Sequence, residues 1–308
     1  MNYLKYIMPV CAVALAAIIL SGCVGVTNEE GTGPTEYWDA AYDYEHQVNT
    51  TLGTQGKLDK FTYEENIITE GQQASYKVGG AFLGQFDTPI RGVEYDYSTG
   101  NNTVVVIGTL KCTVVEYNVT RTKAVNITET FPAWYSVKIY RVYNASNDAT
   151  YYGAEGYWAK YESHDASGSH YTWENPDAVE FNSNYTAYYE GTDNSDAHDE
   201  VVWHLYFSLW GGFWVNYGEG FKDGRKWGVT ISGVAGWSHS TDKTTYTVGS
   251  HTFNAWTAQS KWNSDDGSWV NKAVICTSLP VPLLFQWRID DGGEISSFEY
   301  KLTEVSFK

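Results

Sequence analysis

The chain is poor in cysteine, proline and methionine, and it lacks the short motifs that mark many enzyme sites. It has 4 cysteines, 7 prolines and 2 methionines in 308 residues. No phosphate-cradling glycine loop, dinucleotide-binding glycine fingerprint, Gly-x-Ser-x-Gly turn, His-Glu-x-x-His helix or Cys-x-x-Cys pair occurs. These absences count against nucleotide chemistry, so we expect no catalytic residue and no cofactor.

Basic residues are also scarce. The chain has 20 Lys and Arg against 37 Asp and Glu, which gives a formal net charge of −17. A surface of this sign repels phosphate backbones, because nucleic-acid affinity comes largely from cationic side chains. Nucleic acid is therefore not expected as a partner.

A sustained helical period is missing as well, and turn signals recur at short intervals. Runs rich in Val, Ile, Thr, Tyr and Trp lie between these turns, as is typical of strands. In 134–143 and in 297–303 apolar and polar residues alternate, which indicates a sheet with one wet face, whereas 201–215 is apolar on both faces. The sequence therefore predicts an all-β protein: a large antiparallel curved sheet (half-barrel) or a sandwich, with little helix.

The N-terminal segment is typical of an export signal. A single Lys5 precedes an apolar stretch from Ile7 to Leu20. The ending Leu20-Ser21-Gly22-Cys23 resembles the lipobox of prokaryotic lipoproteins. The resemblance implies cleavage before Cys23 and attachment of a lipid to it, so that the protein is held on the outer face of the cell membrane.

Two alternatives stay open, an uncut helical anchor and simple secretion, because the uncharged run is long enough to span a bilayer. All three place the body of the protein outside the cell. We expect a signal peptide at 1–22, a flexible tether at 23–36 and a β-rich domain at 37–308, with two subdomains that could meet near 190–200.

Cys112 and Cys276 remain once the leader and the lipid site are set aside, and in an exported domain we expect them to form a disulfide. The chain also carries six N-glycosylation acceptor motifs, all in its first two thirds. An archaeal cell surface would account for these motifs together with a lipobox. The acceptors are Asn49, Asn101, Asn118, Asn126, Asn144 and Asn184.

The C-terminal part resembles exported β-rich lipoproteins of the LolA/LppX kind. The resemblance lies in the order of three features: a hairpin opening at 247–253, the segment 275–282 and a closing hairpin at 290–294. It implies a curved half-barrel whose concave apolar face holds an acyl chain, and it carries over no catalytic residue.

Two polar clusters have a functional and a plain interpretation. The segment 190–200 contains five carboxylates, and four of them could bind Ca²⁺, which prefers oxygen ligands, or could simply belong to a solvated turn; the four are Asp193, Asp196, Asp199 and Glu200. The segment 164–170 contains the residue types of a hydrolase triad, but its members are too close in sequence and are interpreted as a turn.

Aromatic residues give the main functional hypothesis, because the chain has 13 Trp and 25 Tyr. Indole rings offer flat apolar area with a donor at the rim, which suits sugar rings and hydrocarbon. We predict a non-catalytic surface lipoprotein that binds an apolar or glycan ligand, or an envelope component, through an aromatic face. The alternatives are a structural cell-envelope or surface-layer protein and an extracellular glycoside-active enzyme. The predicted aromatic residues are Trp203, Tyr206, Trp210, Trp214, Trp237 and Trp256.

Overall fold

The computed structural model is almost entirely β-structure. It describes residues 24–36, 58–69, 71–126, 134–142, 158–180, 183–191, 220–231, 235–264, 267–277, 279, 281–291 and 294–308. Within these ranges the one helical element is the short 3-10 helix η2 (Pro176–Ala178). None of the described segments is a helix with the length and apolar character needed to cross a membrane.

Fourteen strands form one antiparallel sheet, which confirms the predicted fold class. Their order is β1-β11-β12-β13-β14-β15-β16-β3-β4-β5-β6-β7-β8-β9. The bounds are β1 Val24–Glu29, β3 Leu58–Thr69, β4 Gln72–Asp96, β5 Asn101–Val125, β6 Trp134–Val142, β7 Trp158–Asp165, β8 His170–Glu174, β9 Thr186–Gly191, β11 Arg225–Ile231, β12 Ala235–Val248, β13 His251–Ser264, β14 Gly267–Ile275, β15 Leu284–Asp291 and β16 Glu294–Phe307. A separate pair joins β2 (Thr32–Glu36) to β10 (Phe221–Asp223).

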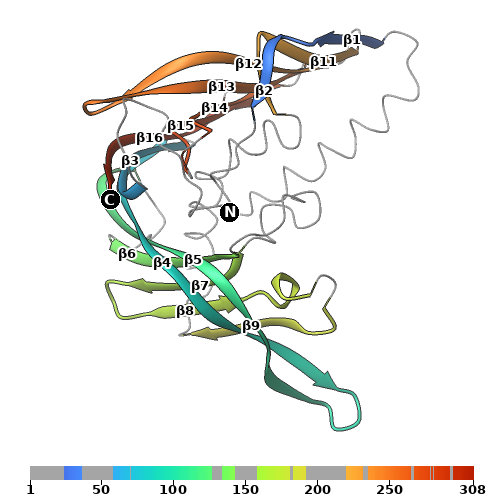
Figure 1. The fold of residues 1–308 in the computed structure, drawn as a ribbon, viewed down its shortest axis with the longest axis vertical. Helices are drawn as coiled ribbons and strands as arrows, with labels where there is room; N and C mark the ends of the chain where they lie inside the picture. Colours follow the sequence, from blue (N-terminus) through green and yellow to red (C-terminus); the bar gives the residue numbers. More distant parts are fainter. Residues whose placement is uncertain are drawn as a thin grey trace.

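The sheet is strongly curved, so that two arms face each other (Figure 1). Strands β11 to β15 form one arm and β4 to β9 the other, with β16 and β3 at the bend. The final strand of the chain pairs with the first long strand, for example Phe298 opposite Ile67. The two halves of the chain are thus joined through the middle of the sheet.

At its far end the sheet closes on itself. Strands β4 and β5 are 25 residues each, and β4 bends near Gly84, whose φ of 121° suits glycine. Beyond this bend, β9 pairs back onto β4 at Gly92 and Val93. Strands β4 to β9 therefore form a closed ring of six strands. A small core lies among them and against η2, and it comprises Ile90, Cys112, Ala159 and Ala178.

The main core covers one face of the sheet in both arms. The alternation predicted for 134–143 is confirmed, because Tyr135, Val137 and Ile139 are buried on that face. Tyr300 and Leu302 of β16 are buried in the same way. Their sequence neighbours point to the opposite face, where the pattern is polar and wetter.

The segment after Cys23 differs from the expected flexible spacer. Val24–Glu29 pairs with β11 along its whole length, and Thr32–Glu36 pairs with β10. The β-branched residues Val24, Val26, Thr27, Thr32 and Thr35 give this segment strand character despite its glycines. Cys23 and the predicted signal peptide 1–22 lie outside the described residues.

The expected disulfide is not formed. Cys112 and Cys276 are both buried, and each carries a thiol outside any disulfide. Cys112 belongs to the small core of the ring, whereas Cys276 belongs to the main core. Pairing would require their Cα atoms to lie within about 7 Å of each other, and the fold assigns them to different clusters instead.

The structure describes four of the six predicted glycosylation acceptors. Asn101, Asn118, Asn126 and Asn184 are all exposed. Asn49 and Asn144 lie outside the described residues. Glycosylation of the six acceptors stays a prediction.

Candidate functional site

The strongest candidate for a binding site is an aromatic surface on β11 to β15. Residues directly opposite on adjacent antiparallel strands share a face. The register therefore assembles one row across five strands: Val229, Trp237, Trp262, Trp269 and Ile289. The next row on the same face is Trp227, His239, Ser260, Asn271 and Trp287. We call Trp227, Trp237, His239, Trp262, Trp269 and Trp287 the aromatic face.

This aromatic face continues the main core toward the end of the sheet. The row beyond His239 contains buried Ala258, Ala273 and Phe285. Trp262 and Trp269 are half-buried, and Trp237 is 46% exposed. Burial thus decreases along the strands, from the row of Ala258 to the row of Trp237, and the indole rings lie between the core and the solvent.

His239 holds two of these indoles in place. Its ring stacks on Trp227, with centroids 4.9 Å apart, and contacts Trp237 edge-on at 4.3 Å. The Nδ1 atom of His239 shares a hydrogen bond of 2.6 Å with the hydroxyl of Ser260. His239 is 8% exposed, so it is a packed, hydrogen-bonded spacer between the rings. The site is consequently preorganised for a flat apolar group.

The positively charged side chain of Arg225 lies at the edge of the aromatic face, next to Trp227. The guanidinium carbon of Arg225 lies 4.8 Å from the centroid of the Trp227 ring. Such a contact orients the indole and offers N–H donors beside an apolar surface. The arrangement can bind rings or chains by stacking, with polar groups recognised at the rim.

The structure places the predicted aromatic residues in different environments. Trp237 is part of the aromatic face. Trp256 is 3% exposed, its Nε1 donates to Glu36 Oε2 at 3.0 Å and its ring stacks on Phe221, so it packs in the core and does not face a ligand. Four others lie outside the described residues: Trp203, Tyr206, Trp210 and Trp214.

Sequence reasoning did not select Trp262 and Trp269 as site residues, although a signal was present. The sequence Asp265-Asp266-Gly267 is typical of a hairpin turn, and the pairing of Ser264 with Gly267 places Trp262 opposite Trp269. Trp227 and Trp287 lie on β11 and β15, which pair with the consecutive strands β12 and β14, so their place on the face depends on the register of these two further connections.

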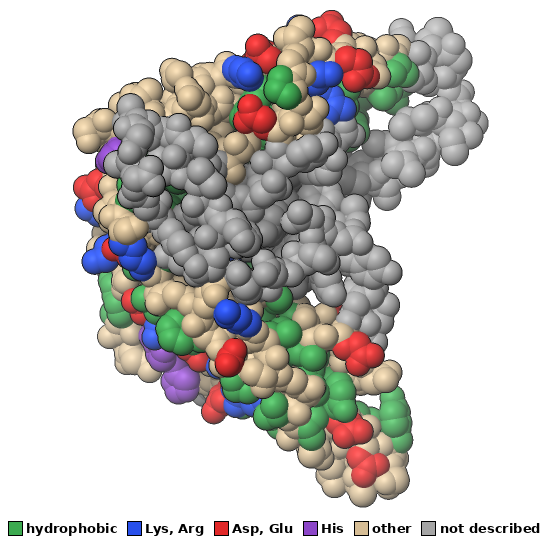
Figure 2. All heavy atoms as spheres, viewed as in Figure 1, with side chains coloured by type: hydrophobic (Ala, Val, Ile, Leu, Met, Phe, Trp, Pro, Cys, Tyr) green, Lys and Arg blue, Asp and Glu red, His purple; other side chains and the backbone are tan. Residues whose placement is uncertain are grey.

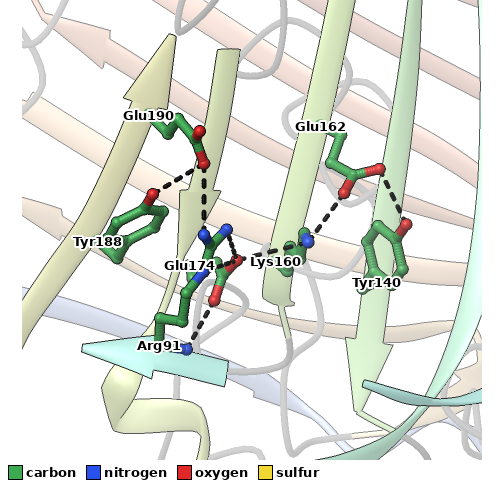
Figure 3. A network of polar contacts seen from close by, with 7 residues as sticks. All are labelled: Arg91, Tyr140, Lys160, Glu162, Glu174, Tyr188 and Glu190. Atoms are coloured by element: carbon green, nitrogen blue, oxygen red, sulfur yellow. Dashed lines mark hydrogen bonds and ion pairs between the residues drawn. The ribbon is translucent and has the colours of Figure 1, made fainter. Parts of the chain in front are cut away.

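A second cluster is a polar network in the ring of six strands (Figure 3). Arg91 on β4 donates to the buried carboxylate of Glu174 on β8: Nε to Oε1 at 3.0 Å, Nη2 to Oε1 at 2.5 Å and its backbone N–H to Oε2 at 2.6 Å. The Nζ atom of Lys160 lies 3.4 Å from Oε1 of Glu174 and 2.8 Å from Oε1 of Glu162. The phenol of Tyr140 donates to Glu162 at 2.9 Å. The network links strands β4, β6, β7 and β8.

The outer side of this network is more exposed. Arg91 Nη1 lies 3.3 Å from Oε2 of Glu190, and the Tyr188 hydroxyl donates to the same oxygen at 2.8 Å. The Arg91 guanidinium also stacks 3.8 Å above the Tyr188 ring. Both partners are on β9, the strand that closes the ring.

Electrostatics stabilise the charged forms within this network. The hydrogen bond to Glu174 raises the pKa of Arg91 against the opposing effect of burial. Burial alone would raise the pKa of Glu162, but Lys160 and Tyr140 lower it overall. Burial, followed by the neighbouring Glu162 carboxylate, raises the pKa of Tyr140, so its phenol remains a donor. The network is suited to holding strands together.

The proposed calcium ligands cannot be placed. Asp193, Asp196, Asp199 and Glu200 lie outside the described residues. In the part of the chain that is described, no group of three or more His, Cys, Asp or Glu side chains is arranged to bind a metal ion. Calcium binding at that loop stays a prediction.

The segment 164–170 is a turn, as interpreted from its sequence. Oδ1 of Asp165 accepts hydrogen bonds from the backbone N–H of Ser167 at 2.8 Å and from its hydroxyl at 2.6 Å. The backbone N–H of Ser169 donates to the same oxygen at 3.0 Å. These bonds form the tight connection between β7 and β8.

Comparison with known proteins provides little further information. No family model matches the chain, and no curated protein matches it. A solved structure from Bacteroides fragilis, described as a "putative exported protein with YmcC-like fold", is similar over 83% of this chain and 99% of its own. The two are 9% identical, with a TM-score of 0.23. A score this low supports no inference about fold or function.

Proposed function

We propose that the protein is a non-enzymatic binding protein, anchored to the outer face of the cell membrane through a lipid on Cys23. The observation that supports binding is the row of Trp237, Trp262 and Trp269 on three adjacent strands. With strands about 4.8 Å apart, three indoles present a flat apolar strip about 10 Å long. A strip of this kind suits an acyl chain or a short glycan.

Two features support an external location. The sequence before Val24 has the layout of a lipoprotein signal. Four glycosylation acceptors lie on exposed positions, where a glycan could be attached without disturbing the core. Both are compatible with a body that folds after export.

Titration of the full chain with oligosaccharides and short-chain phospholipids, followed by tryptophan fluorescence, tests the binding function. A ligand of the aromatic face should shift the emission of the wild type, and Trp262→Ala should remove most of that shift. Trp134→Phe is the matched control, because Trp134 is 37% exposed but belongs to β6 in the other arm. Unchanged emission across both ligand classes, or equal shifts in wild type and Trp262→Ala, would contradict the proposal.

A structural role in the cell envelope is the second candidate, and an exposed apolar patch favours it. The hairpin of β4 and β5 projects from the ring (Figure 1), and Figure 2 shows hydrophobic side chains among acidic ones there. Tyr97 is 91% exposed, and Val104 and Val106 are 50% and 64% exposed. Self-assembly that sedimentation detects in the wild type, and that Tyr97→Ser with Val106→Thr removes, would support this role; a monomer at all concentrations would oppose it.

A further inference from the structure

The body of the protein begins immediately after the proposed lipid site. Val24 is paired with Ile231, and every residue of β1 has a partner in β11 as far as Glu29. Val24 directly follows Cys23, and consecutive Cα atoms are about 3.8 Å apart. A lipid on Cys23 would therefore be attached to the sheet without a spacer.

This anchor point lies beside the exposed end of the aromatic face. Val26 is opposite Val229, and Val229 is opposite Trp237, so the three residues share one face of the sheet. Two residues of strand separate Val24 from Val26, about 7 Å, and two strand spacings separate Val26 from Trp237, about 10 Å. Trp237 is thus about 12 Å from Val24, the residue that follows the proposed lipid site in the sequence.

The side chains in this region are apolar and accessible. Val26 is 73% exposed and Trp237 is 46% exposed. The polar layer of one leaflet is about 5 to 8 Å deep, and tryptophan favours this layer because its ring is apolar and its N–H is a donor. An apolar valine and a half-exposed tryptophan next to a membrane anchor match this environment.

We infer that the end of the sheet formed by β1, β11 and β12 rests in the headgroup layer of the bilayer that carries the lipid on Cys23. The surface turned to the bilayer is the one that bears Val26 and Trp237. This inference depends on the lipidation in the proposed function, and it identifies bilayer lipid as the partner of the exposed end of the aromatic face.

The negative charge of the protein indicates which headgroup charge the contacting bilayer should have. Asp290 and Asp291 lie at the same end of the strands as Val24, because Asp291 is in the row of Gly267, Ser264 and Ala235. With a formal net charge of −17, the protein is repelled by anionic headgroups. The contact should therefore form on zwitterionic lipid and weaken on anionic lipid.

The test uses the full chain, expressed in a lipidating host and reconstituted in phosphatidylcholine vesicles. Val26→Cys and, separately, Thr27→Cys are labelled with an environment-sensitive fluorophore. Thr27 is the matched control, because it is exposed on the same strand but points to the opposite face. Cys112 and Cys276 are buried and should not be labelled in the folded protein.

The label at Val26 should shift to the blue and be quenched several-fold more by brominated phosphatidylcholine than the label at Thr27. As a second measurement, Trp237→Phe should lower the quenching of intrinsic fluorescence by brominated lipid, whereas Trp134→Phe should not. Equal quenching at Val26 and Thr27, with a lipid confirmed on Cys23 by mass spectrometry, overturns the bilayer contact alone. An unmodified Cys23 overturns the proposed anchoring itself.

Discussion

Arg91 and Glu174 are 83 positions apart in the chain, yet one carboxylate accepts three hydrogen bonds from this arginine. The side chain of Glu174 is 1% exposed and that of Arg91 is 29% exposed. The pair joins β4 to β8 across the ring, next to the point where β9 pairs with β4. It therefore secures the closure of the sheet, which has only two residue pairs between β4 and β9.

Glu174→Gln should destabilise the protein by about 3 kcal/mol, because it leaves Arg91 and Lys160 without their buried counter-charge. Denaturant unfolding followed by circular dichroism measures this change. Glu190→Gln is the control, since Glu190 contacts the same arginine from an exposed position, with 55% of its side chain accessible. Exposed pairs contribute little, so similar losses in the two variants would contradict the structural role of Glu174.

Glu162 should make stability fall in acid. Its pKa in the folded protein is below the ordinary value of 4.5, because Lys160 and Tyr140 outweigh the effect of burial. A lowered pKa means that the stabilising contribution is fully present above pH 4.5 and is lost as the pH falls through the folded value. The difference in unfolding free energy between wild type and Glu162→Gln should narrow between pH 6 and pH 3.

Lys160→Met provides the control for this pH effect, because it removes the cation that lowers the pKa of Glu162. In the Lys160→Met background, Glu162→Gln should change the unfolding free energy by less, and this change should depend less on pH. If the difference in unfolding free energy between wild type and Glu162→Gln does not change with pH, the Glu162 carboxylate is not stabilised by its neighbours.

Gly80 lies directly beneath the Phe61 ring. A Cβ at this position would lie 2.0 Å from Cζ of Phe61. Gly80→Ala should therefore destabilise the protein by about 1 to 3 kcal/mol, because the buried ring must move. Gly79→Ala is the matched control: the nearest atom to its Cβ is 3.9 Å away, and a slight gain of stability is expected. Thermal unfolding measures the difference in midpoint temperature between Gly80→Ala and Gly79→Ala. Equal midpoints would contradict the close contact between Gly80 and the Phe61 ring.

The two buried cysteines should behave as inert thiols. Burial raises the pKa of Cys112 to about 11, although a hydrogen bond with Thr88 opposes the rise. Since the thiolate is the reactive form, iodoacetamide at pH 8 should modify Cys112 and Cys276 only after unfolding. Mass spectrometry should find both thiols without prior reduction. A pair joined by a disulfide would contradict the fold, because the two residues belong to separate cores.

The sequence predicted local strand character well, because alternation with a period of two is a local property. Tyr135, Val137 and Ile139 were placed on one face correctly, as was the turn at Asp165. The predicted disulfide between Cys112 and Cys276 was wrong, because the number of cysteines in a sequence gives no information on the distance between them in the fold. From Val24 onward the expected spacer is instead a pair of strands, because β1 pairs with β11, between 197 and 207 residues later in the chain.

The candidate site was predictable only in part. Trp237 was selected from the abundance of tryptophan after residue 195, and the turn at 265–267 contained the information that pairs Trp262 with Trp269. The positions of Trp227 and Trp287 beside that hairpin depend on the registers of two further strand pairs, β11 with β12 and β14 with β15. Arg91 and Glu174 gave no signal at all, because a contact between distant residues leaves no periodic pattern nearby.

The position of β16 in the sheet determines when the two arms can be joined during folding. Strand β16 lies between β15 and β3, and Phe307 pairs with Leu58, 249 positions earlier. The two arms cannot be joined through β16 until residues 294–307 have been made. Contacts of such long sequence separation slow folding and expose unpaired strands in the meantime. Until β16 is available, the facing edges of β15 and β3 lack their partner, and these edges are where association between incomplete chains is expected.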